Sequence, residues 1–125
     1  MDELVRWLGE QLARDREIAC EAKRVIGDDW VVDEGEYGFV LSDGDTVAYF
    51  EDVGGGTAMS RAAAVHAAEH DPARVLREID AKRRMLGRIN SHAAVMGQDE
   101  VHGDLLRLLA LPYADRPGYR EEWRP

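Results

Sequence analysis

The sequence is poor in cysteine and in long apolar runs, and each shortage excludes a class of protein. Cys20 is the single cysteine among 125 residues, so the chain can form neither an internal disulfide nor a metal site built from several of its own thiolates. No run approaches the roughly 20 apolar residues that a membrane-spanning helix needs. The first residues are acidic and no apolar segment follows them, which argues against a secretory signal. We expect a cytoplasmic protein that is not embedded in a membrane.

Basic side chains are also scarce. The chain has 16 Lys and Arg against 25 Asp and Glu, which gives a formal net charge of -9. Proteins that bind nucleic-acid phosphates or anionic membranes need a surplus of Lys and Arg. The composition therefore argues against nucleic acid as a partner. Nine of the acidic residues lie between positions 28 and 52, where no Lys or Arg occurs.

The spacing of apolar residues predicts a single α+β domain that is mostly helical. Steps of three and four residues predict long helices over 2–26 and 72–96 and shorter ones over 58–70 and 100–110. Over 30–52, β-branched and aromatic runs separated by glycine-containing turns predict a three-stranded antiparallel β-meander, which we expect to pack against the long helices. The segment 111–125 combines prolines with three aromatic residues, and we expect it to dock on the core because burying aromatic side chains favours the ordered state.

Two charged residues fall within the apolar stripes of the predicted long helices. On a helical wheel Asp15 lies beside Leu4 and Leu8, and Lys82 lies in the stripe of the helix over 72–96. A carboxylate in such a position needs a partner, because burying it alone costs free energy. We therefore predict that Asp15 and Lys82 form a partly buried pair.

Arginines are concentrated on the helix predicted over 72–96, and four of them fall in one narrow arc opposite its apolar stripe. They are Arg74, Arg77, Arg84 and Arg88. Such an arc is usually only a solvated, salt-bridged surface. The alternative is a docking face for an acidic protein or for a second copy of this chain. The interaction surface that we predict consists of this arc together with Tyr119 and Trp123 of the C-terminal segment.

His66, Glu69 and His70 match the H-x-x-E-H pattern of the inverted zinc peptidases. In those enzymes two histidines on one helix face bind zinc and the glutamate acts as the base. A zinc-binding protein or metal-dependent hydrolase is therefore one alternative function. Against it, no third ligand follows at a distinctive spacing, and His66 also suits a position at the edge of the core.

A second alternative is an acidic mimic of nucleic acid with a phage-related role, in which the carboxylates of segment 28–52 imitate phosphates and occupy a DNA-binding protein. The sequence contains no Gly-x-Ser-x-Gly elbow and no phosphate-binding Gly-Lys-Ser/Thr motif. We therefore expect a non-enzymatic protein-interaction or regulatory module that binds a protein partner or itself.

Two stretches of the chain together resemble a known family. They are HDPARVLREIDAKRRML over 70–86 and LLALPYADRPGYREEWRP over 108–125. Both are similar to a family of short proteins of unknown function from high-GC actinobacteria, whose members also occur in phage-associated DNA. The resemblance covers most of the chain and is least distinctive over 30–52. It implies family membership and no catalytic residues, because the family has no established activity to carry over.

Overall fold

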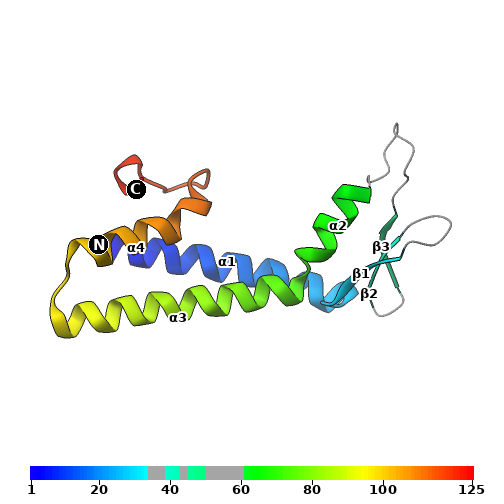
Figure 1. Ribbon diagram of the computed structural model, residues 1–125, viewed down its shortest axis with the longest axis horizontal. Helices are drawn as coiled ribbons and strands as arrows, with labels where there is room; N and C mark the ends of the chain where they lie inside the picture. Colours follow the sequence, from blue (N-terminus) through cyan, green and yellow to red (C-terminus); the bar gives the residue numbers. More distant parts are fainter. Residues whose placement is uncertain (34–38, 43–44, 50–60) are drawn as a thin grey trace. The chain divides into compact units, whose positions relative to one another are not determined.

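The computed structural model of the chain describes residues 1–33, 39–42, 45–49 and 61–125. Figure 1 shows the elements, and their order is α1 (Asp2–Ile26), β1 (Trp30–Asp33), β2 (Phe39–Ser42), β3 (Asp45–Tyr49), α2 (Arg61–Glu69), α3 (Pro72–Met96) and α4 (Glu100–Ala110). Two short 3-10 helices follow, over Leu111–Tyr113 and Glu121–Trp123. Among the helices of the described ranges, none combines the length and the apolar character needed to cross a membrane.

The long helices begin and end at local signals in the sequence. α1 carries Asp2 and Glu3 in its first turn and Lys23 and Arg24 in its last, which suits the helix dipole, and it ends before Gly27 at a φ of 101°. α1, α3 and α4 coincide with the ranges predicted from the sequence. α2 falls within the predicted 58–70, and the first residues of that prediction lie outside the described part of the chain.

Contacts between residues divide the chain into two compact units, where the sequence predicted a single domain. Unit 1 comprises Met1–Asp15 and Glu78–Pro125, and unit 2 comprises Arg16–Arg77. Both chain termini therefore belong to unit 1. The sheet and α2 belong to unit 2.

In unit 2 the three short strands pair antiparallel in the order β1-β2-β3. Val31 lies opposite Leu41, and Val40 lies opposite Ala48. The helix that the sheet contacts most extensively is α2, whose Ala64 is fully buried against Trp30, Val32 and Val47. The small alanine side chains of α2 allow this close approach.

The predicted fold class, an α+β domain whose meander packs on the long helices, is wrong. The structure is mostly helical, as predicted, but its strands contain only four or five residues each. A sheet of that size has too little surface to cover a 25-residue helix, and α2 occupies it instead. Parts of the predicted segment 30–52, namely 34–38, 43–44 and 50–52, lie outside the described residues.

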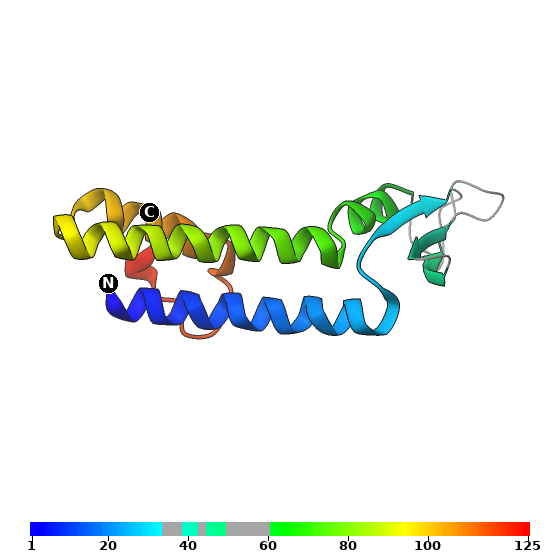
Figure 2. The same ribbon diagram turned by 90° about the horizontal axis from the view of Figure 1, so that it is seen from below.

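Unit 1 is built from residues 2–15 of α1, residues 78–96 of α3, α4 and the C-terminal segment. In both Figure 1 and Figure 2 these helices lie side by side, and the two termini lie near each other. The core takes side chains at four-residue steps from α1 and α4, together with aromatic residues of the C-terminal segment. Its buried members include Leu4, Leu8, Leu12, Ile79, Leu106, Ala110, Tyr113 and Trp123.

Candidate functional site

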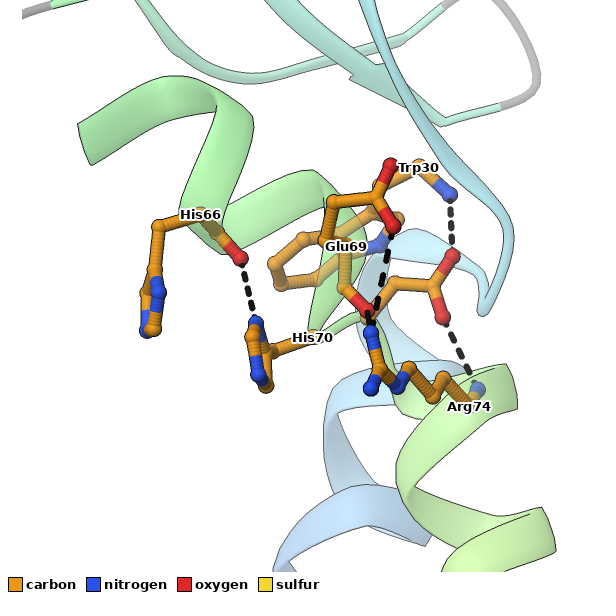
Figure 3. A network of polar contacts seen from close by, with 6 residues as sticks. Trp30, His66, Glu69, His70 and Arg74 are labelled. Carbon is orange, nitrogen blue, oxygen red and sulfur yellow. Dashed lines mark hydrogen bonds and ion pairs between the residues drawn. The ribbon is translucent and has the colours of Figure 1, made fainter. Parts of the chain in front are cut away.

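The predicted metal ligands His66 and His70 are exposed at the end of α2, where their rings stack with centroids 4.2 Å apart. Figure 3 shows that Nδ1 of His70 faces the main-chain oxygen of His66, at 2.8 Å. The carboxylate of Glu69 instead faces Arg74, 3.8 Å from its guanidinium. Within the described ranges, no three His, Cys, Asp or Glu side chains converge on one point. The predicted grouping of His66, Glu69 and His70 is therefore not formed, because the Glu69 carboxylate faces Arg74 and Nδ1 of His70 faces the main-chain oxygen of His66.

Asp71 is a buried structural cap between α2 and α3. One of its carboxylate oxygens accepts a hydrogen bond from the main-chain N–H of Arg74 at 2.9 Å, and the other accepts one from the N–H of Trp30 at 3.0 Å. The first bond caps α3, as the Asp-Pro pair in the sequence favours. The second ties β1 to the start of α3. With both oxygens occupied, this carboxylate has a structural role.

The four arginines of the predicted docking face have different environments. Arg74 donates to the main-chain oxygen of Glu69 at 3.0 Å and so belongs to the turn before α3. Arg77, Arg84 and Arg88 are exposed, but Arg77 belongs to unit 2 and the other two belong to unit 1. The role of the arginines in binding a partner stays a prediction.

The aromatic part of the predicted interaction surface is a packed cluster instead. Trp123 is buried, and its ring lies 5.4 Å from that of Trp7 and 5.9 Å from that of Tyr119. The indole N–H of Trp7 donates to the main-chain oxygen of Pro117 at 3.1 Å. Tyr119 and Trp123 therefore attach the C-terminal segment to α1. Packing their rings on Trp7 removes apolar surface from water, which favours this arrangement.

Asp15 and Lys82 do not form the direct pair predicted from the sequence. Asp15 accepts a hydrogen bond from Arg116 at 2.5 Å, and Lys82 donates to the hydroxyl of Tyr113 at 3.4 Å. The negative charge of Asp15 also acts on that hydroxyl, so Tyr113 interacts with both of the predicted partners. Burial, and then the negative charge of Asp15, raise the pKa of Tyr113 to about 12. The guanidinium of Arg116 covers the tyrosine ring at 4.7 Å from its centre.

An apolar groove lies between α3 and α4 in unit 1. It has a volume of about 450 Å³, and its walls are almost entirely apolar. Met85 is 46% exposed there, Leu105 43% and Leu108 53%, which is unusual for large apolar side chains that lie together. The full lining is Arg84, Met85, Arg88, Ile89, Leu105, Leu108 and Leu109.

The groove exists because α4 has two apolar faces. His102, Leu106 and Ala110 are buried at four-residue steps and attach the helix to unit 1. Val101, Leu105 and Leu108, spaced by four and three residues, form a second stripe that stays exposed. A helix needs only one such stripe to pack against its own protein. The sequence shows both stripes as one apolar cluster, so it did not reveal which of them is left open.

A second pocket of about 450 Å³ lies between α1, α3 and α4, and the buried His102 forms part of its wall. Nδ1 of His102 accepts a hydrogen bond from the main-chain N–H of Asp99 at 3.1 Å, and its Nε2 lies 2.8 Å from Nδ1 of His92. The main-chain N–H of His102 donates to the carboxylate of Asp99 and lowers the pKa of that carboxyl. Both ring nitrogens of His102 are thus engaged by protein groups. Asp99 and His102 together cap the start of α4, because the side chain of each accepts a hydrogen bond from the main-chain N–H of the other. The three-residue spacing of Asp99 and His102 was the available sequence signal.

Five of the nine acidic residues in the segment proposed as a nucleic-acid mimic lie outside the described residues. Asp28 and Asp29 precede β1, Asp33 ends it and Asp45 begins β3, whereas the acidic positions 34, 36, 43, 51 and 52 are not described. Lys23 of α1 pairs with Asp28 at 3.3 Å.

Comparison with known proteins identifies a family. No curated protein and no solved structure matches the chain. One family does match, described as a family of unknown function, DUF6221, and the match extends over residues 1–125. The chain therefore belongs, over its whole length, to the family DUF6221.

Proposed function

We propose that this chain is a protein-interaction module that binds a partner in the groove between α3 and α4. The observation that carries the proposal is the exposure of Met85, Leu105 and Leu108 in one apolar depression. Leaving three large apolar side chains in water costs free energy that a bound partner would recover. Large exposed apolar patches with polar borders are typical of protein-binding sites.

The docking surface proposed here differs from the arc predicted from the sequence. It keeps Arg84 and Arg88, which line the groove, and it excludes Arg74, which belongs to the turn before α3. Tyr119 and Trp123 are excluded as well, because they pack on Trp7. Apolar side chains then supply the affinity, and the arginines supply orientation.

The test uses a photo-crosslinking amino acid at position 85 in the cells that produce the chain. We expect a discrete crosslinked product that disappears when Leu108→Asp places a charge in the groove. The matched control is Val95→Asp on α3, since Val95 is 82% exposed and does not line the groove. The control should keep the product. A product that survives Leu108→Asp, or the lack of any product, contradicts the proposal.

A further inference from the structure

We propose that the occupant of the groove is a short amphipathic helix of a partner protein with acidic residues along the edge that faces α3. This inference rests on the proposed function and adds the conformation and the charge of the partner segment. The groove is lined over about one and a half turns each of α3 and α4, from Arg84 to Ile89 and from Leu105 to Leu109. It is therefore short and open, which suits the side chains of a peptide segment better than an enclosed small molecule.

A helix suits this groove because, apart from the two arginines on its α3 border, its walls offer almost no hydrogen-bonding groups. An extended peptide laid on Met85, Leu105 and Leu108 would bury main-chain N–H and C=O groups without partners. β-Strand addition would require an open sheet edge, and no strand lies in the described residues of unit 1. A helix satisfies its own main chain and presents apolar side chains at three- and four-residue steps. These steps match the exposed stripe of Val101, Leu105 and Leu108.

The border of the groove on α3 is basic. Arg84 and Arg88 lie one turn apart, and both line the groove. Arg84 pairs with Asp80 at 2.9 Å, but both side chains are strongly exposed, so this pair contributes little stability and exchanges readily. Within the described part of the chain, Arg88 has no carboxylate partner. A helix with acidic residues on that edge would compensate both guanidinium groups as they lose water, whereas a basic helix would be repelled.

A second copy of the chain is a less suitable occupant. In a two-fold dimer both sides of the interface carry the same residues, so a groove-to-groove contact would gather Arg84 and Arg88 of both copies and would include no carboxylate from the groove lining. Like charges at such a contact oppose association. The charge of the border therefore favours a different, acidic protein segment.

The experiment titrates three peptides of about 14 residues into the full chain and follows the methyl NMR signals of Met85, Leu105 and Leu108. Each peptide carries leucines at its third, seventh and tenth positions, the steps of one helix face. The acidic peptide has glutamate at the flanking positions, the basic peptide has lysine there, and the third is the acidic peptide with two central prolines that prevent a helix.

We expect the acidic peptide to shift the groove signals, the basic peptide to bind about tenfold more weakly, and the proline peptide to cause no shift. The double variant Arg84→Glu/Arg88→Glu should reverse the preference between the acidic and the basic peptide. Arg83→Glu is the matched control, because Arg83 is exposed on α3 but does not line the groove. It should leave the order of the three peptides unchanged.

The outcomes separate this inference from the proposed function. Equal binding of the acidic and basic peptides in the groove overturns the acidic partner, and equal binding of the proline peptide overturns the helix, while the interaction module stands. Dimerisation of the chain that is abolished by Leu108→Asp identifies a second copy as the occupant and also overturns the inference. If no peptide binds the groove but the crosslinked product forms in cells, the acidic helical occupant is overturned and the proposed function stands. If neither peptide binding nor the crosslinked product is observed, the inference and the proposed function are both overturned.

Discussion

Asp15 accepts a hydrogen bond from Arg116 at 2.5 Å, although the two residues lie 101 positions apart in the sequence. This contact ties the C-terminal segment to α1. Arg116 also donates to Gln11 at 3.3 Å, and its guanidinium lies over the ring of Tyr113. Arg116 of the C-terminal segment is therefore the partner that Asp15 requires. Lys82 donates to the hydroxyl of Tyr113, on which the charge of Asp15 also acts.

The Asp15–Arg116 pair should contribute more to stability than the other ion pair between α1 and the tail. Both of its side chains are mostly buried, whereas Glu3 and Arg120 are about half exposed. We expect Asp15→Ala to lower the free energy of unfolding by about 2 to 3 kcal/mol, because it leaves a partly buried guanidinium unpaired. Glu3→Ala is the matched control and should cost about 1 kcal/mol or less. Chemical denaturation of both variants measures the difference, and equal losses would show that the Asp15 contact has no special weight.

Gly118 is required by its backbone conformation and by the proximity of Trp7. Its φ is 86°, and a Cβ atom at this position would lie 2.8 Å from Nε1 of Trp7. Gly118→Ala should therefore destabilise by about 3 kcal/mol, since a left-handed backbone cost and a steric clash add together. Gly97 has a similar φ of 82° but open space around it, so Gly97→Ala isolates the backbone cost of about 1 kcal/mol.

Thermal unfolding of the two glycine variants tests this account of the contact between Gly118 and Trp7. A larger loss of Tm for Gly118→Ala than for Gly97→Ala is expected. Tryptophan fluorescence should also change in Gly118→Ala only, because Trp7 must move to admit the methyl group. The same Tm for both variants would mean that the C-terminal segment moves without loss of stability and that Trp7 leaves room for a methyl group at position 118.

The buried Tyr113 should make the chain sensitive to alkali. Its folded pKa, about 12, lies above the ordinary value of about 10, so the protonated hydroxyl is favoured by folding. The resulting stabilisation is fully present below pH 10 and is lost as the pH rises from about 10 to about 12. We expect the stability of the wild type to fall more steeply over that range than that of Tyr113→Phe. Parallel stability curves for the two proteins would contradict the assigned burial.

Acid should weaken the start of α4 through Asp99. The main-chain N–H of His102 holds the pKa of Asp99 below its ordinary value, so the cap stabilises the helix at higher pH. This contribution is lost as the pH falls below the ordinary value of about 4 and through the lowered folded value. We expect the Cα chemical shifts of α4 to lose helical character on acidification in the wild type.

Asp99→Asn provides the decisive comparison for α4, because asparagine caps a helix about as well as aspartate but does not titrate in this range. The variant should keep its helical shifts as the pH falls. Asp104→Asn, in the same helix and paired with Arg107 at 3.2 Å, should behave as the wild type. An acid response that persists in Asp99→Asn would assign the effect to another group.

Several features of the fold could be predicted from the sequence because they depend on neighbours along the chain. α1 ends where Gly27 adopts a positive φ, α3 begins at Asp71 and Pro72, and α4 begins where Asp99 caps it. Caps and apolar periodicity depend on residues a few positions apart, so they can be recognised from the sequence without a structure. Even the need of Asp15 for a partner followed from its place on the α1 wheel.

What only the tertiary structure decided was which surfaces meet. Glu69 matches a zinc motif along the chain but faces Arg74. Trp123 was predicted both to dock with the C-terminal segment and to form part of an interaction surface, and it packs on Trp7. Likewise, Leu106 and Leu105 are adjacent and equally apolar, yet one is buried and the other lines an open groove. The sequence by itself determined where the helices start and stop and which residues are apolar or charged. Burial depends on the free energy of packing segments that are distant in sequence. Which apolar and charged residues contact one another was therefore decided by the tertiary structure.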